Sequence, residues 1–186
     1  MEEKVTNAID IEIGNISKGK ALTAEELLNK DVQSIPKLVD PLFQKTGLVA
    51  VGGSSDVGKS TLLRQLAIAI ATNQQSFLGF PINAKYNKAI YVSTEDDEYA
   101  ISYLLNKYNA YAKFETTDYN GLRFIFEVAE LVSELDKQLT ADPADIVIID
   151  AFTDLYSGKL NEANKVRTFL NEFSQLSVKN ETLFVF

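Results

Sequence analysis

The stretch Gly47-Leu-Val-Ala-Val-Gly-Gly-Ser-Ser-Asp-Val-Gly-Lys-Ser-Thr61 decides the fold of this chain of 186 residues. Its apolar first part, Gly47–Gly53, is typical of a buried β-strand that runs into a glycine turn. The second part, Gly53–Ser60, fits the pattern G-x-x-x-x-G-K-[ST]. The pattern continues into a helix predicted over residues 59–72, which has an apolar face. Three residues four apart form that face: Leu62, Leu66 and Ile70.

A strand, a glycine turn and a helix in this order predict a P-loop, which binds a purine nucleoside triphosphate. Backbone N–H groups and the helix N-terminus offer positive potential to phosphate oxygens. Lys59 is expected to bridge the β- and γ-phosphates, Ser60 to ligate Mg²⁺ and Thr61 to contact the α-phosphate. The alternative is a glycine-rich turn with an incidental lysine, which the flanking strand and helix disfavour. The predicted nucleotide-binding residues are Gly53, Ser54, Ser55, Asp56, Val57, Gly58, Lys59, Ser60 and Thr61.

Two carboxylates follow apolar strands elsewhere in the chain. Asp150 ends the strand predicted over residues 145–150, where P-loop enzymes hold the acid that orients Mg²⁺. Glu95 follows the strand predicted over residues 89–93, and its carboxylate could accept a proton from the attacking water. Because parallel strands end at one edge of a sheet, both acids are expected near the P-loop. The alternatives are a strand-ending aspartate and a loop acid or helix cap, with Asp96 or Asp97 taking the cap role.

Strands alternate with helices along the chain, which predicts an α/β fold: a mainly parallel sheet covered by helices on both faces, in three α/β/α layers. Residues 1–22 are expected to form a weakly structured arm and residues 23–186 the nucleotide-binding domain. Thr23–Glu26 matches a capping box, so a short helix should follow it. The chain ends on a strand that looks central, which we interpret as a domain truncated after a core strand. The further predicted segments are a connector between Pro36 and Pro41, a loop over 77–87, helices over 98–113, 131–139 and 164–178, and strands over 122–128 and 182–186.

Other polar and aromatic residues receive structural interpretations. The aromatic residues of the helix over 98–113 have helical spacing, so packing is favoured over base stacking; they are Tyr99, Tyr103, Tyr108, Tyr111 and Phe114. Thr153 and Asp154 either sense the γ-phosphate or cap a turn. The basic residues Lys159, Lys165 and Arg167 flank a loop over residues 161–164, which is interpreted as solvated rather than as a DNA contact.

Composition excludes several classes of function. The chain has no Cys and no His, which rules out zinc clusters, thiol catalysis and Ser-His pairs. A net charge of −8 argues against a basic nucleic-acid-binding module, though not against a DNA motor with a few basic loops. No apolar run approaches the roughly 20 residues of a membrane span, and no signal peptide opens the chain, so a cytoplasmic protein with no membrane contact is expected.

The order of these motifs resembles the RepA-like branch of the RecA/DnaB-type ATPases, which are hexameric replicative helicases of plasmids and mobile elements. The resemblance rests on the P-loop, the strand end Thr94-Glu-Asp-Asp97, and Ile146-Val-Ile-Ile-Asp-Ala-Phe-Thr-Asp-Leu-Tyr156. It implies a RecA-like P-loop fold, with Lys59 and Glu95 as catalytic residues and Ser60 and Asp150 as the metal-binding residues.

The resemblance also implies ATP and Mg²⁺ as cofactors, a homo-oligomer of six subunits, and single-stranded DNA as a partner of the full-length protein. The arginine finger and the DNA-contacting loops of that family would lie beyond Phe186. Two other functions stay open at this point. One is an ATP-binding regulator of assembly with little turnover, which the intact Glu95 disfavours. The other is a P-loop small-molecule or nucleotide kinase, although no arginine-rich lid is found in the sequence.

Asp56 departs from this resemblance, because relatives commonly have glycine in the middle of the P-loop. We expect the Asp56 carboxylate to face solvent or a neighbouring subunit rather than the triphosphate. Asp56→Gly should therefore change the dissociation constant for Mg-ATP by less than about tenfold, ~1.4 kcal/mol, in a titration with a fluorescent ATP analogue. Tighter binding by tenfold would mean that the acid repels the phosphates.

Overall fold

The computed structural model describes residues 21–156 and 163–186. The chain divides into two compact units, Met1–Ile35 and Pro36–Phe186. In the first unit, α1 (Ala24–Leu28) begins after Thr23, whose Oγ1 accepts from the Glu26 N–H at 3.1 Å while the Thr23 N–H donates to Glu26 Oε2 at 2.7 Å. The predicted capping box is thus confirmed. The arm over 1–22 falls almost wholly outside the described residues, and its boundary with a domain over 23–186 stays a prediction.

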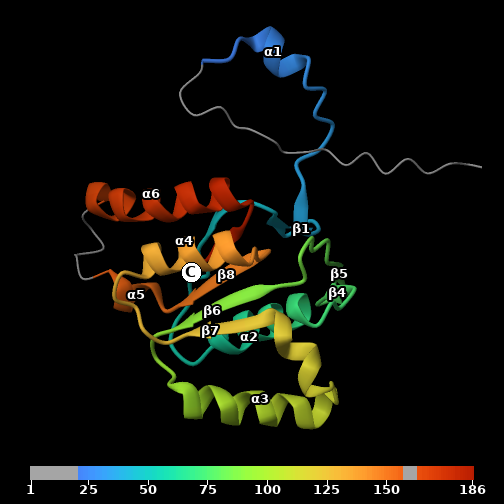
Figure 1. Ribbon diagram of the computed structural model, residues 1–186, viewed down its shortest axis with the longest axis vertical. Helices are drawn as coiled ribbons and strands as arrows, with labels where there is room; N and C mark the ends of the chain where they lie inside the picture. The colour runs from blue at the N-terminus through green and yellow to red at the C-terminus, as the bar shows by residue number, and fades with distance from the viewer. Residues whose placement is uncertain (1–20, 157–162) are drawn as a thin grey trace, which may run out of the picture. The chain divides into compact units, whose positions relative to one another are not determined.

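A wholly parallel sheet of five strands forms the centre of the second unit (Figure 1). The three central strands are buried throughout except at the final Asp150, and the two edge strands are half-buried. This confirms the α/β fold predicted from the apolar runs, and the strand that ends the chain is indeed central. In spatial order the strands are β3 (Gly47–Val49), β9 (Leu183–Val185), β8 (Ile146–Asp150), β6 (Ala89–Ser93) and β7 (Leu122–Ile125).

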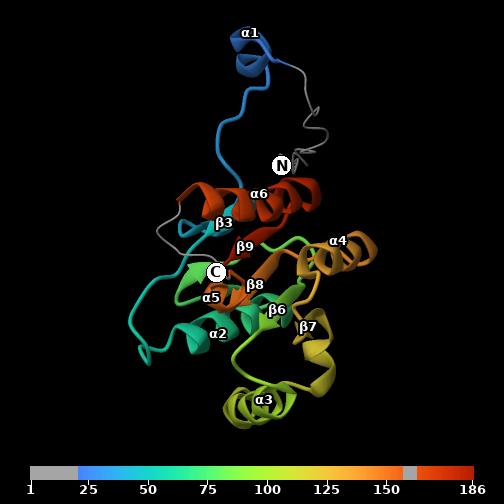
Figure 2. The same cartoon turned by 90° about the vertical axis from the view of Figure 1, so that its left-hand side faces the viewer.

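Helices cover both faces of the sheet and complete the predicted three layers (Figure 2). One face packs on α2 (Lys59–Ala71), with α3 (Glu98–Ala112) beside it, and its core includes Tyr91, Ile148 and Val185. The other face packs on α4 (Leu131–Ala141) and α6 (Ala163–Asn180). Successive strand residues alternate between the two cores, as the pleat of a strand requires. The remaining helical turns are η1 (Thr116–Gly121) and α5 (Phe152–Leu155).

Two predicted irregular segments form hairpins instead. The connector after Pro36 contains β1 (Lys37–Val39), which pairs with β2 (Phe43–Gln44), because the buried Leu38 and Val39 side chains join the core beside α2. The loop over 77–87 contains β4 (Ser76–Phe77) and β5 (Phe80–Pro81). Leu78 and Gly79 both have positive φ, 51° and 81°, which suits the two-residue turn of a tight hairpin. The sequence lacks the usual Asn-Gly signal for this turn.

The packing prediction for the tyrosines of α3 is wrong for three of them. Tyr99, Tyr103 and Tyr111 are 77%, 66% and 84% exposed. The reason is that α3 buries only Ile101 fully, so most of the helix surface faces away from the core. Tyr108 is half-buried, and the half-buried Phe114 packs edge-on against Tyr119 with ring centroids 6.0 Å apart.

Three smaller predictions also need correction or comment. Leu62 is 38% exposed, and the apolar face of α2 centres on Leu63, Leu66 and Ile70 instead. The strand over 122–128 ends at Ile125, which pairs with Val92, one residue before the end of β6. Lys159 lies outside the described residues.

Within the described ranges, no helix combines the length and apolar character that a bilayer crossing requires.

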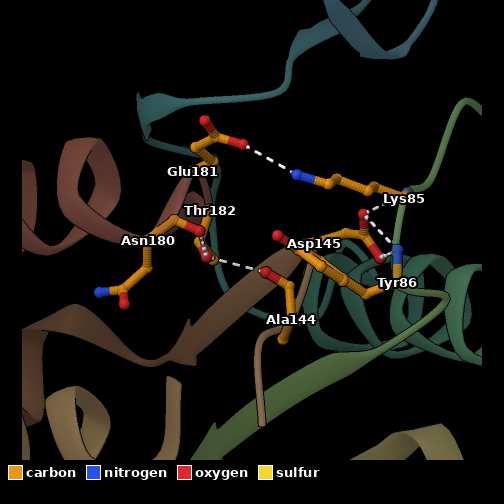
Figure 3. A network of polar contacts seen from close by, with 7 residues as sticks. All are labelled: Lys85, Tyr86, Ala144, Asp145, Asn180, Glu181 and Thr182. Carbon is orange, nitrogen blue, oxygen red and sulfur yellow. Dashed lines mark hydrogen bonds and ion pairs between the residues drawn. The ribbon is translucent and has the colours of Figure 1, made fainter. Parts of the chain in front are cut away.

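A buried carboxylate fixes the amino ends of the strands (Figure 3). Asp145, 5% exposed, precedes β8 and accepts from the backbone N–H groups of Lys85 at 2.5 Å, Tyr86 at 3.0 Å and Lys88 at 3.2 Å. Thr182, which precedes β9, donates to the Ala144 carbonyl at 2.8 Å. These bonds tie the segment before β6 to the starts of β8 and β9, so they hold the three central strands in register.

We predict that Asp145→Ala lowers the free energy of unfolding by about 3 kcal/mol, because it leaves buried N–H donors without an acceptor. Urea denaturation measures this change. Asp142→Ala is the matched control: Asp142 pairs with Lys88 and Arg123 near the surface, and its loss should lower the free energy of unfolding by about 1 kcal/mol at most. Equal effects of the two variants would contradict the structural role of Asp145.

Candidate active site

The P-loop connects β3 to α2 at the carboxyl edge of the sheet. Gly58 is the N-cap of α2 with φ of 89°, a left-handed conformation that favours glycine. Gly53 has a different constraint, since a Cβ there would lie 3.3 Å from Val57 Cγ2 and 3.5 Å from Lys59 Cδ. The loop conformation therefore favours glycine at position 58, whereas a side chain at position 53 would require the Val57 side chain to shift slightly. Asp56 is exposed, with φ of 62°.

Lys59 lies across this loop. Its Nζ donates to the carbonyl oxygens of Gly53 at 3.0 Å and Ser54 at 2.8 Å. An ammonium held at the mouth of the loop is near the position that a phosphate-binding lysine requires. Ser60 follows in the first turn of α2, half-buried, and the Thr61 side chain is exposed.

The strand register brings the two predicted acids to the same edge. Ser93 at the end of β6 pairs with Asp150 at the end of β8. Thr94 extends the pairing: its N–H donates to the Asp150 carbonyl at 2.9 Å, and its Oγ1 accepts from the Ala151 N–H at 2.9 Å. Thr94 Oγ1 also donates to Asp154 Oδ2 at 2.7 Å, which gives Asp154 a role in the turn. The segments that carry Glu95 and Asp150 are therefore clamped together.

Asp150 accepts a hydrogen bond from a buried phenol. Tyr91, on β6 and only 1% exposed, donates from its hydroxyl to Asp150 Oδ2 at 2.5 Å. Burial raises the pKa of the Tyr91 phenol well above its usual range, and the hydrogen bond to Asp150 raises it further. Tyr91 therefore stays a protonated donor and orients the Asp150 carboxylate. A tyrosine within an apolar run is the signal in the sequence that points to such a contact, and it does not identify the partner.

One cavity of about 700 Å³ is lined by several of these groups. The P-loop residues Gly53, Ser55 and Lys59 line it together with Glu95 and Asp150. Thr153 lines it as well, and an apolar wall completes it, formed by Val166, Leu170, Phe152 and Phe186. The side chains of Asp56, Val57 and Thr61 are exposed and do not line the cavity. The other predicted residues that do not line it are Ser54, Gly58 and Ser60.

The three acidic residues of the turn after β6 make different contacts. Asp97 is the N-cap of α3, accepting from the Ala100 N–H at 2.8 Å, as the helix-cap alternative predicted. Asp96 pairs with Arg64 of α2, with Oδ2 and Nη2 3.2 Å apart. Glu95 is exposed toward the cavity, and in the described part of the chain its side chain has no hydrogen-bond partner.

The oxygen donors available for a metal are few. Within residues 21–156 and 163–186, no group of three or more acidic, His or Cys residues could hold a metal ion. Ser60 and Asp150, the two predicted metal-binding residues, would supply two oxygens, and Mg²⁺ commonly takes the rest of its six ligands from substrate phosphates and water. The residues present thus fit a Mg²⁺ that arrives with a nucleotide, rather than a metal held by protein alone.

A comparison with protein families identifies this arrangement. Residues 16–185 match an AAA domain family (AAA_25). The chain belongs to the AAA domain family. It is a P-loop domain of the nucleotide-binding, ATPase type, and P-loop ATPases generally bind ATP with Mg²⁺. A search of curated proteins gave no significant match to the chain.

The Tyr91 contact in this AAA domain generates a prediction. Tyr91→Phe keeps the buried ring and removes the donor to Asp150, which is worth about 1 kcal/mol. If Asp150 orients Mg²⁺, the Mg²⁺ concentration for half-maximal ATP binding should rise by about three- to tenfold. A Mg²⁺ titration with a fluorescent ATP analogue measures it. The control Tyr103→Phe alters an exposed hydroxyl on α3 and should leave the midpoint unchanged; equal midpoints for both variants would contradict the role of Tyr91.

Proposed function

We propose that this AAA domain hydrolyses Mg-ATP as a RecA-like motor of the RepA-like branch, within a DNA helicase or another replication or mobilisation protein. The observation that carries the proposal is the cavity in which the P-loop, Glu95 and Asp150 meet. A phosphate cradle, a lysine, a metal-binding acid and a proton acceptor are the groups that phosphoryl transfer to water uses.

The proposed reaction is an in-line attack of water on the γ-phosphorus. The water oxygen forms a bond to phosphorus, the bond to the β–γ bridging oxygen breaks, and ADP and phosphate leave. Glu95, whose exposed side chain lines the cavity, accepts the proton of the water. Lys59 leaves its loop carbonyls to hold the β- and γ-phosphate oxygens, where charge develops.

Metal binding in this proposal is assigned to Ser60 and Asp150, with Tyr91 and Thr94 holding the Asp150 segment. The bound Mg²⁺ would neutralise phosphate charge in the transition state. The backbone N–H groups of residues 53–61 would hold the phosphates at the N-terminus of α2. ATP binding between subunits of a homo-oligomer and contact with single-stranded DNA belong to the proposal on the resemblance alone.

The test compares the steady-state rate of ATP turnover by the unsubstituted protein with the rates of two variants. Lys59→Ala should abolish turnover and weaken binding, and Glu95→Gln should bind Mg-ATP with turnover reduced by about a hundredfold or more. Glu98→Gln, an exposed acid in the first turn of α3, is the matched control and should leave turnover unchanged.

The effect of single-stranded DNA on the rate of ATP turnover distinguishes a DNA motor from a nucleotide-dependent regulatory switch. If the protein is a DNA motor, single-stranded DNA should raise the turnover rate of the native protein but not that of Glu95→Gln. If the native protein binds ATP but shows no turnover with or without single-stranded DNA, the hydrolase proposal is wrong and a nucleotide-dependent switch is favoured.

A further inference from the structure

Arg64 is a buried arginine that the proposed chemistry does not use. It lies on α2, one helical turn after Ser60, and its side chain is 9% exposed. Its guanidinium carbon lies 5.9 Å from the centroid of the Tyr91 ring, and Nη2 meets Asp96 Oδ2 at 3.2 Å. The helix that begins at the P-loop is thus connected by a buried charge to the turn after β6.

This charge is not explained by stability. The Arg64 Nε atom is buried and has no hydrogen-bond partner in the described part of the chain, which is unfavourable for a charged donor. Buried ion pairs often stabilise a fold no more than apolar side chains of similar size. The residues near Arg64 along α2 are buried and apolar: Leu63, Ala67 and Ile68. The arginine therefore calls for a reason other than packing.

The geometry of the turn supplies that reason. Glu95 directly precedes Asp96, and its own side chain has no partner among the described residues, so neighbouring contacts set its position. Ser93 Oγ donates to the Asp96 carbonyl at 2.7 Å and Asp97 caps α3, which fixes the two ends of the turn. Among the hydrogen bonds of the turn within the described residues, the Arg64–Asp96 bond is the one that reaches α2.

We propose that Arg64 is a positioning residue, which holds the Glu95 turn against the P-loop helix through Asp96 so that the Glu95 carboxylate faces the γ-phosphate. The inference rests on the proposed hydrolysis. A displacement of the base by even about 1 Å lowers turnover strongly without changing nucleotide binding. Replacing Arg64 should therefore lower kcat and leave KM unchanged, because Lys59 and the backbone N–H groups of the loop bind the phosphates without Arg64.

Arg123 offers a matched control. It is also partly buried, also has a buried Nε without a partner in the described chain, and also pairs with an aspartate, Asp142, at 3.5 Å. It lies on β7, and its guanidinium contacts Gln138 of α4 rather than α2 or the Glu95 turn. Replacing either arginine by methionine removes the same chemistry, but only Arg64 reaches the catalytic turn.

The experiment measures two quantities on Arg64→Met, Asp96→Asn, their double variant, Arg64→Lys and Arg123→Met. Steady-state ATP turnover should show kcat lowered about tenfold in Arg64→Met and Asp96→Asn with KM within twofold. The double variant should be no worse than the poorer single variant, and Arg64→Lys should recover part of kcat. Deuterium uptake without nucleotide should rise in the peptide covering residues 93–98 for Arg64→Met, and not for Arg123→Met.

Each outcome decides one of the two proposals. Unchanged uptake over residues 93–98 in both Arg64→Met and Asp96→Asn overturns the positioning role, whatever the turnover. So does unchanged kcat in both variants when Glu95→Gln is inactive and the native protein is active. Raised uptake in a protein whose native form has no turnover supports the anchoring by Arg64 and rejects hydrolysis, so the two failures are distinguishable.

Discussion

The parallel pairing of β6 with β8 is the constraint on which the rest of the structure depends. It runs from Ala89 opposite Ile146 to Ser93 opposite Asp150, and both strands are buried on both faces. Because side chains alternate along a strand, a slip by one residue would send Tyr91 to the opposite core and break its bond to Asp150. The hydrophobic pattern that stabilises the sheet therefore also decides which acids reach the P-loop.

Much of this was predictable from the sequence, because the signals are local. The apolar run at residues 89–93 gave its strand with the observed limits, and the glycine motif gave the turn between β3 and α2. The convergence of Lys59, Glu95 and Asp150 on one cavity followed from a rule of parallel sheets, namely that the carboxyl ends of the strands share an edge. Once the strand type is known, that rule needs no knowledge of individual contacts.

The contacts that tune the site were not predictable, since their partners lie far apart in the chain. Tyr91 meets Asp150 across 59 residues, and Arg64 meets Asp96 across 32. The available signal is a polar residue inside an apolar run, which must find a partner because buried polar groups are rarely left unpaired. That signal marks Tyr91 without naming its partner, and it does not mark Arg64, which is followed by Gln65. The exposed tyrosines of α3 escaped prediction for a related reason: helical spacing shows that residues share a face, not which face is buried.

The two edges of the sheet differ in how completely their polar groups are satisfied. At the amino edge, Asp145 is saturated by backbone N–H groups that no ligand can replace. At the carboxyl edge, Lys59 donates to two neutral carbonyls of its own loop, and Glu95 has no partner in the described chain. A phosphate offers charged acceptors, which bind an ammonium more strongly than carbonyls do. If Lys59 has its proposed role, nucleotide binding would therefore exchange its two bonds to loop carbonyls for stronger bonds to phosphate oxygens.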